Sequence, residues 1–369
     1  MRIAAYIHPD RVGGSETGVS KHIRHMVLGL ARRSDVDLSI MAARKDWAAA
    51  VRRVDPHPLA GLTRADLPGS RRWLEKAWAV LNHPTADRWC PGADWVYCPM
   101  EAYVPTRRAR LAVTVHCVNW FDPDVPWYGA MGGARARTRL RMGRAFRRED
   151  VQILAVSEFL KGRLVDLFGL RPERIAVVYN GVEDAYYRVG DGPPTPAGPP
   201  YLIVVGGLTE RKGGSYVVRL ADALQARGSS LEIWVAGESE PAFAAARHHP
   251  RIKHLGYRGV DTGLPALMRG AVALLFLSRY ETFGIPAVEG MAAGTPVVVS
   301  RWAGLPEVVG PAGLVVDADK TDNVTDQVLA LAADPAARAD WIARGRRRSQ
   351  DFLWDRCVDQ LLAALRAAA

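Results

Sequence analysis

In both halves of this chain, short apolar runs of strand length alternate with amphipathic helices. Residues 3–7 precede a helical pattern over 19–31, and residues 202–205 precede one over 216–225. Such alternation predicts parallel sheets covered by helices, one sheet in each half. At 369 residues, the chain is also too long for one compact core. The expected fold class is therefore α/β, with two doubly wound, Rossmann-like domains facing each other across a cleft.

A segment rich in proline and glycine, residues 190–200, separates the two halves. Its prolines lack an N–H donor and fix φ, so it fits neither a helix nor a central strand. We predict an N-terminal domain over residues 1–190, a linker over 191–200 and a C-terminal domain over 201–351. The last segment, 352–369, has a helical period. It either joins the first domain or packs on its own domain, and the sequence leaves both placements open.

Two acidic residues, Glu281 and Glu289, lie eight positions apart around a predicted junction between a strand and a helix. The apolar run 271–277 predicts the strand, and Pro286 suits the first turn of the helix. Glu289 is then expected in that first turn. Carboxylates in this position accept hydrogen bonds from hydroxyl groups.

The same junction is expected to attract an anion. The first backbone N–H groups of a helix have no intrahelical partner, and the helix dipole adds positive charge at that end. The residues concerned are Phe283, Gly284 and Ile285. A ligand with both phosphate and hydroxyl groups, such as a nucleotide sugar, would use the N–H groups and the two carboxylates together.

Further motifs occur along the chain in a fixed order. They are Gly13-Gly14-Ser15-Glu16, Val115-His116, Ala155-Val156-Ser157, Val178-Tyr179-Asn180-Gly181-Val182, Val205-Gly206-Gly207, Gly294-Thr295-Pro296 and Gly304-Leu305-Pro306-Glu307. With the Glu281-to-Glu289 pair, this series resembles glycosyltransferase family 4, whose members are retaining enzymes of the two-Rossmann-domain (GT-B) type. The resemblance implies a hexosyltransferase that uses a nucleoside diphosphate sugar and a hydroxyl acceptor, with no metal or other cofactor.

The resemblance also implies roles for individual residues. Glu289 would hold the ribose, and Glu281 would face the hydroxyls of the donor sugar. Arg211 and Lys212, in a glycine-rich loop after a strand, suit a diphosphate whose negative charge grows as the glycosidic bond breaks. His116 would contact the donor sugar, although Cys117 follows it where many members have aspartate.

These residues form two predicted sets. The catalytic set is Glu281, Arg211, Lys212 and His116, and the donor-binding set is Gly13, Gly14, Gly207, Phe283, Gly284, Ile285 and Glu289. Three Asp-x-Asp triplets, at 35–37, 122–124 and 317–319, are interpreted as turns rather than metal ligands. We expect no metal, because Arg211 and Lys212 already supply positive charge.

The basic charge is concentrated in the first half. Residues 1–190 contain 30 Lys+Arg and 20 Asp+Glu, whereas residues 191–369 contain 19 of each. The segments 71–78 and 135–148 concentrate arginine. Contact with an anionic membrane surface is one interpretation. The other is a set of solvated faces, since only 7 of the 49 basic residues are lysine.

Two rival functions fit parts of the sequence. An inactive protein with this fold could bind anionic lipid or nucleic acid through its arginines, although no nucleic acid partner is expected if the chain is an enzyme. A dinucleotide oxidoreductase is disfavoured, because no Gly-x-Gly-x-x-Gly follows a strand. The motif around Phe283 resembles that of many bacterial envelope mannosyltransferases, which implies GDP-mannose as the donor, and UDP-linked sugars stay open.

Cysteine spacing and hydropathy predict the compartment. The four cysteines, at 90, 98, 117 and 357, show no disulfide or zinc spacing and are expected to be free thiols. No apolar run reaches the length of a membrane span, and the first residues read as a strand rather than a signal peptide. We expect a cytoplasmic protein, located at the inner face of the membrane if the basic segments bind lipid.

Overall fold

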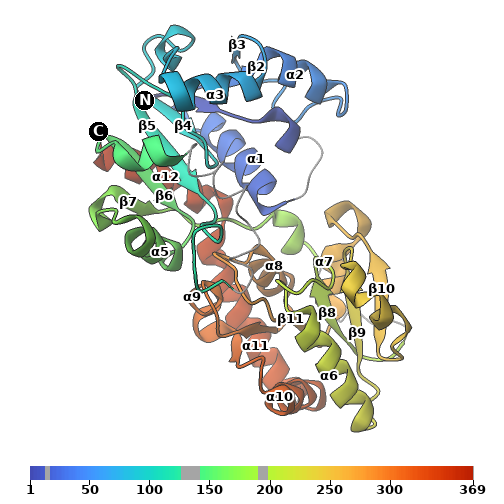
Figure 1. Cartoon of the computed structure of the whole chain (residues 1–369). Helices are drawn as coiled ribbons and strands as arrows, with labels where there is room; N and C mark the ends of the chain where they lie inside the picture. The colour runs from blue at the N-terminus through green and yellow to red at the C-terminus, as the bar shows by residue number, and fades with distance from the viewer. Residues whose placement is uncertain (13–16, 126–141, 190–197, 369) are drawn as a thin grey trace. The chain divides into compact units, whose positions relative to one another are not determined.

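The computed structural model describes residues 1–12, 17–125, 142–189 and 198–368, and the chain divides into two compact units (Figure 1). Unit 1 comprises Met1–Asn180 and Trp354–Ala369, and unit 2 comprises Gly181–Leu353. Each unit contains one parallel sheet flanked by helices. The predicted α/β fold with two Rossmann-like sheets is confirmed.

Unit 1 is built on a seven-stranded parallel sheet in the order β3-β2-β1-β4-β5-β6-β7. Its strands are β1 (Arg2–Tyr6), β2 (Asp37–Ala43), β3 (Arg64–Leu67), β4 (Trp95–Cys98), β5 (Arg110–Val115), β6 (Val151–Ala155) and β7 (Ile175–Val177). The strand order reverses between β1 and β4. In doubly wound sheets, ligands bind beyond the carboxyl ends of the strands at this point.

The helices of unit 1 include the one predicted over residues 19–31. They are α1 (Gly18–Ala31), α2 (Arg44–Val51), α3 (Arg71–Leu81), α5 (Glu158–Phe168), α12 (Trp354–Ala367) and a helix over 142–147, with 3₁₀ turns η1 (Pro9–Arg11), η2 (Ala86–Arg88) and η4 (Pro172–Arg174). The Thr17 side chain caps α1 by accepting a hydrogen bond from the Ser20 N–H. Of the apolar face that the period predicted, Ile23, Val27 and Leu30 are fully buried and Val19 is partly buried.

The C-terminal helix α12 packs against α1 within unit 1. The two helices approach so closely that a Cβ atom added to Gly29 would lie 2.5 Å from Val358 Cγ2. An ion pair of 2.8 Å between Arg33 and Asp359 supports the contact. Of the two placements that the sequence left open, the structure has the one in which this helix joins the first domain.

Unit 2 repeats the doubly wound topology with six parallel strands in the order β10-β9-β8-β11-β12-β13. The strands are β8 (Tyr201–Val205), β9 (Glu232–Ala236), β10 (Ile252–Gly256), β11 (Ala273–Phe276), β12 (Val297–Ser300) and β13 (Leu314–Val316). The helices are α6 (Gly214–Ala226), α7 (Leu264–Gly270), α8 (Ile285–Ala293), α9 (Leu305–Val309), α10 (Thr321–Ala333) and α11 (Pro335–Ser349), with 3₁₀ segments η5 (Asp184–Tyr186), η6 (Pro241–His248), η7 (Val260–Thr262), η8 (Gly310–Ala312) and η9 (Gln350–Phe352).

The boundary between the units falls at Asn180 and Gly181, ten residues before the predicted end of the first domain. The residues after Gly181 bond to the end of unit 2: the Val182 N–H donates to the Phe352 carbonyl at 2.9 Å, and the Tyr187 hydroxyl donates to the Ser349 carbonyl at 2.9 Å. These contacts correct the predicted boundary. Most of the predicted linker, residues 191–197, lies outside the described residues.

The prediction of free cysteines is confirmed, since none of the four takes part in a disulfide. Three of them, Cys90, Cys98 and Cys357, are buried. Within the described ranges, no helix has both the length and the apolar character that crossing a bilayer requires.

Candidate active site

The predicted donor-binding residues of unit 2 lie at the switch point of its sheet. The strand order reverses between β8 and β11, which pair in parallel, so their carboxyl ends lie side by side. The glycine-rich loop with Arg211 and Lys212 follows β8, and the loop with Glu281 follows β11 and leads into α8. The topology therefore brings these two sequence motifs to one edge of one sheet.

The loop after β8 is compact, and its glycines are required by close contacts. The N–H groups of Gly206 and Gly207 both donate to the Ala236 carbonyl at the end of β9, at 2.7 and 3.1 Å. A Cβ atom on Gly206, where φ is +93°, would lie 1.8 Å from Lys212 Nζ. The Lys212 side chain is thus folded back so that its ammonium covers the backbone of Gly206.

The two loops are tied to each other. Arg211 Nη1 donates to Glu281 Oε1 at 2.9 Å, and the Arg279 N–H donates to the Arg211 carbonyl at 2.9 Å. A second ion pair, of 2.8 Å, joins Arg279 to Glu210. The predicted catalytic residues Arg211 and Glu281 are therefore in direct contact, with the carboxylate more buried than the guanidinium.

Lys212 lies in the field of both predicted acids. Burial lowers the pKa of its ammonium, Glu281 acts to raise it, Arg211 acts to lower it and Glu289 acts to raise it, and the net result is a pKa below the ordinary value. A bound anion would favour the charged form of such a group. The two glutamates therefore offset only part of the cost of burying the charge of Lys212.

Helix α8 begins at Ile285, as Pro286 predicted, but Glu289 does not lie in its first turn. The helix has Gly284 as its N-cap, and no acidic residue occurs in the first turn. Glu289 is the fifth helical residue, and its side chain is only 3% exposed. The expectation of a first-turn acid was wrong. A favourable helix dipole does not account for a carboxylate buried this deeply beyond the first turn.

The amino end of α8 is fixed from two sides. The Gly304 N–H donates to the Glu281 carbonyl at 2.8 Å, and the Phe283 ring contacts Phe352 edge-on at 5.5 Å. Helix geometry leaves the first N–H groups of α8 without intrahelical acceptors. These groups, at the positions predicted for anion binding, therefore belong to a rigid part of unit 2.

His116 lies in unit 1, directly after β5, and its side chain is 7% exposed. Its Nε2 lies 3.0 Å from the Pro99 carbonyl, which can only accept, so Nε2 carries the proton. The N–H groups of His116 and Cys117 both donate to Glu101 Oε1, at 2.5 and 3.1 Å. One carboxylate, not singled out from the sequence, thus anchors the loop that holds the predicted histidine.

A second buried histidine lies against the first. The rings of His22 and His116 meet edge-on at 4.6 Å. His22 Nδ1 lies 2.8 Å from Asn180 Oδ1, and its Nε2 lies 3.2 Å from the Tyr97 hydroxyl. Burial lowers the pKa of His22 well below its ordinary value, the charge of His116 lowers it further, and the bond to Asn180 opposes both. The lowered pKa favours the neutral form of His22, whose ring packs against His116.

Other predicted residues lie elsewhere. Gly13 and Gly14 fall outside the described residues. Of the Asp-x-Asp triplets, Asp122 is buried and accepts from Arg163 Nε at 2.8 Å, and Asp317 pairs with Arg301 at 3.4 Å. In the part of the chain that the structure describes, no group of three or more His, Cys, Asp or Glu side chains is arranged to hold a metal ion.

Sequence reasoning missed three residues around these sites. They are Glu101, Arg279 and His22. Glu101 follows β4 by three positions and Arg279 follows β11 by three. Ligands bind beyond the carboxyl ends of strands in such sheets, so the positions of both residues could have identified them as candidates. His22, in contrast, lies inside the helical period of α1, where the sequence offers no reason to separate it from its neighbours.

Solved structures share this two-unit architecture. HepE from Anabaena, crystallised in complex with UDP and glucose, superposes with a TM-score of 0.67 at 16% identity, over 100% of both chains. Sucrose-phosphate synthase from Thermosynechococcus elongatus gives a TM-score of 0.71 at 18% identity, again over 100% of both. The fold of this chain, two parallel-sheet α/β domains, is thus the GT-B fold of glycosyltransferases.

Sequence comparisons define the family. The family model described as Glycosyltransferase Family 4 matches residues 17–186, and the model described as Glycosyl transferases group 1 matches residues 199–334. The chain is 27% identical to O-antigen chain mannosyltransferase B from Escherichia coli over 77% of this chain and 78% of that protein. It is 26% identical to D-inositol 3-phosphate glycosyltransferase from Acidothermus cellulolyticus over 99% and 89%. The chain belongs to glycosyltransferase family 4, and it is an enzyme of the glycosyltransferase class.

Proposed function

We propose that this protein transfers a hexose from a nucleoside diphosphate sugar to a hydroxyl acceptor, with retention of the anomeric configuration and without a metal ion. The observation that carries the proposal is the joining of the two loops at the switch point of unit 2. There Arg211 and Lys212 lie beside Glu281 at the amino end of α8, and Glu289, further along that helix, acts electrostatically on Lys212. This arrangement offers cations to a diphosphate and carboxylates to hydroxyl groups.

The reaction follows from this chemistry. The bond between the anomeric carbon and the terminal phosphate oxygen breaks, and both electrons go to the leaving diphosphate. Arg211, Lys212 and the first N–H groups of α8 stabilise the growing charge. The acceptor oxygen bonds to the same face of the oxocarbenium-like sugar, and its proton passes to the departing phosphate oxygen. Glu281 orients the sugar hydroxyls, and Glu289 holds the ribose.

The donor is proposed to carry mannose. The Escherichia coli relative is named a mannosyltransferase, and so is the MMP alpha-(1->4)-mannosyltransferase of Mycolicibacterium hassiacum, which is 29% identical over 73% of this chain and 66% of that protein. A GDP-linked donor fits these names, whereas HepE was crystallised with UDP and glucose. The base therefore has to be decided by experiment.

Thermal unfolding with UDP or GDP, each with and without EDTA, tests the donor site. A nucleotide present at about 100 times its dissociation constant stabilises the folded state by about 2.7 kcal/mol. We expect a shift with one nucleotide that persists in EDTA and is lost in Glu289→Ala. A shift that EDTA abolishes would exclude the metal-free site, and turnover of GDP-mannose with inversion at the anomeric carbon would exclude retention.

Peripheral contact with an anionic membrane is the remaining part of the proposal, and it rests on helix α3. Trp73, Val80 and Leu81 are 58%, 65% and 70% exposed, and the helix also carries exposed basic residues. The second basic segment gives less support. Arg144 donates to the carbonyls of Ala79 and Val80, at 2.7 and 2.8 Å, so it caps α3 instead of facing a membrane. Residues 135–141 of that segment lie outside the described residues.

A further inference from the structure

A second basic site lies at the amino edge of the unit 1 sheet. A cavity of about 820 Å³ opens there, near the first residues of β1, β4 and β5. Ligand sites of proteins commonly have volumes of about 300–1,000 Å³. Four arginines line it, and two aspartates oppose them: Arg88, Arg107, Arg108, Arg110, Asp87 and Asp94.

Both aspartates are already engaged by the backbone. Asp87 accepts from the N–H groups of Arg107, Arg108 and Ala109, at 2.7, 3.0 and 2.9 Å. Burial raises the pKa of this carboxyl, but the three N–H bonds outweigh that effect and hold its pKa below the ordinary value. Asp94 likewise accepts from the Arg2 N–H at 2.7 Å. The two carboxylates thus shape the cavity through their bonds to the backbone.

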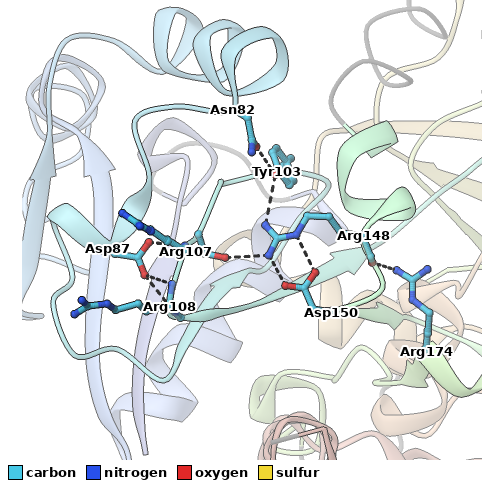
Figure 2. A network of polar contacts seen from close by, with 10 residues as sticks. Asn82, Asp87, Tyr103, Arg107, Arg108, Arg148, Asp150 and Arg174 are labelled. Atoms are coloured by element: carbon cyan, nitrogen blue, oxygen red, sulfur yellow. Dashed lines mark hydrogen bonds and ion pairs between the residues drawn. The ribbon is translucent and has the colours of Figure 1, made fainter.

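The arginine side chains have no such partners. Among the described residues, none of the four forms an ion pair with a carboxylate, and all four are exposed. Arg88 and Arg110 lie over the rings of Trp89 and Trp95, at 5.8 and 5.6 Å from the ring centroids. Figure 2 shows that Arg107 and Arg108 point away from the Arg148–Asp150 pair, although Arg110 lies within the longer-range field of Asp150.

Neighbouring arginines of unit 1 differ, because their guanidinium groups donate hydrogen bonds to protein acceptors. Arg148 Nε donates to Asp150 at 2.9 Å (Figure 2), and Arg174 Nη1 donates to the Phe146 carbonyl at 3.1 Å. Arg148 also contacts the Tyr103 hydroxyl. As far as the structure describes the chain, the arginines of the cavity lack equivalent contacts, so their exposed guanidinium groups are available to pair with an anionic ligand.

From these observations we propose that the cavity binds a ligand that carries two or more phosphate groups. Guanidinium groups present forked pairs of N–H donors that match phosphate oxygens, and four around one cavity exceed what a single phosphate can use. The site is separate from the residues at the carboxyl edge. Arg110 begins β5 and His116 follows its end, and a strand of six residues is about 20 Å long.

Tripolyphosphate is the probe for the test, with binding measured by calorimetry. The experiment uses the Lys212→Met variant, so that the proposed donor site does not add a second binding event. We expect tripolyphosphate to bind this variant, and the further changes Arg107→Gln and Arg108→Gln to weaken binding about tenfold. Their N–H bonds to Asp87 come from the backbone, so the substitutions leave the anchoring of the segment intact.

The matched control is the adjacent exposed pair Arg52 and Arg53 in the same unit. Changing both to glutamine alters the net charge equally but leaves the cavity unchanged. Equal weakening by the two double variants, or no binding to Lys212→Met, would overturn the proposal. The donor site is judged separately, in the Arg107→Gln/Arg108→Gln variant, so that the cavity adds little nucleotide binding: if the donor site is wrongly assigned, adding Lys212→Met to that variant leaves its affinity for UDP and GDP unchanged.

Vesicles distinguish the two sources of phosphate. Sedimentation with phosphatidylglycerol vesicles that tripolyphosphate displaces, and that the Arg107→Gln/Arg108→Gln change reduces, would assign the site to lipid headgroups. Tripolyphosphate binding without such vesicle binding would assign it to a soluble phosphorylated compound. Vesicle binding that resists tripolyphosphate and does not depend on the two arginines would belong to another surface and would count against a headgroup in this cavity.

Discussion

Replacing Gly206 by alanine should displace Lys212 without unfolding unit 2. The added Cβ atom would lie 1.8 Å from Lys212 Nζ and 3.0 Å from its Cε, and real Cβ atoms do not approach so closely. The clashing atoms belong to the end of a flexible side chain, which can move away. The backbone cost is that of a left-handed residue, about 1–2 kcal/mol, because φ at Gly206 is +93°.

Gly228→Ala is the matched control for this substitution. Gly228 lies in the same unit at φ +64°, and an added Cβ atom would have no neighbour within 4 Å. Both variants should therefore lose about 1–2 kcal/mol in free energy of unfolding. For a unit of this size that corresponds to a fall in melting temperature of about 2–4 °C for each kcal/mol.

The two variants should differ in nucleotide binding. If Lys212 contacts the diphosphate from its place over Gly206, moving it removes a charge-assisted contact worth about 1.5–3 kcal/mol. The dissociation constant of the nucleotide would then rise about 10- to 150-fold in Gly206→Ala and stay unchanged in Gly228→Ala. Isothermal titration with UDP and GDP measures this directly. Equal affinity in the two variants would refute the reasoning, because the methyl group would then have displaced nothing that the nucleotide uses.

Three further predictions concern single side chains. Glu101→Ala leaves two backbone N–H groups without their acceptor. We therefore expect kcat to fall while the thermal shift with nucleotide is retained. Glu101→Gln keeps an acceptor oxygen and should recover most of the activity. The folded-state pKa of Lys212 lies below its ordinary value. The free energy of unfolding should therefore rise as the pH increases from the folded-state pKa to the unfolded-state pKa of this side chain. Urea unfolding of Lys212→Met over a pH series should lack that rise. Phe352→Ala empties a fully buried position, and chemical denaturation should show a loss of about 3–5 kcal/mol, with a loss below 1 kcal/mol contradicting the packing described.

Elements whose signal is local were predictable from the sequence. The alternation of apolar runs and helical periods gave the two parallel sheets, and Pro286 marked the beginning of α8. The position of Glu289 beyond the first turn was not predictable, because it depends on Gly284 serving as the N-cap. The sequence alone could not show how a junction is capped when glycine, proline and threonine are all close by.

Contacts between distant segments carry no local signal. The Val182 N–H bonds to the Phe352 carbonyl, and this contact, not the proline-rich segment, sets the boundary of unit 2. The N–H groups of His116 and Cys117 bond to Glu101, 15 and 16 residues away. In both cases each segment by itself resembles an ordinary turn, and only the folded chain shows which atoms meet.

The excess of arginine in the first half is another feature that only the folded structure explains, and the explanation bears on function. A charge count treats every arginine alike, but the structure separates them by partner. Arg144 caps a helix, Arg163 neutralises the buried Asp122, and Arg148 pairs with Asp150. The pair of Arg163 with the buried Asp122 is shielded from solvent, so added salt should affect it little, whereas the partly exposed Arg148–Asp150 pair should be screened more. Within the part of the chain that the structure describes, the arginines of the amino-edge cavity have no carboxylate partner, and it is there that binding of a phosphorylated ligand should weaken as the salt concentration rises.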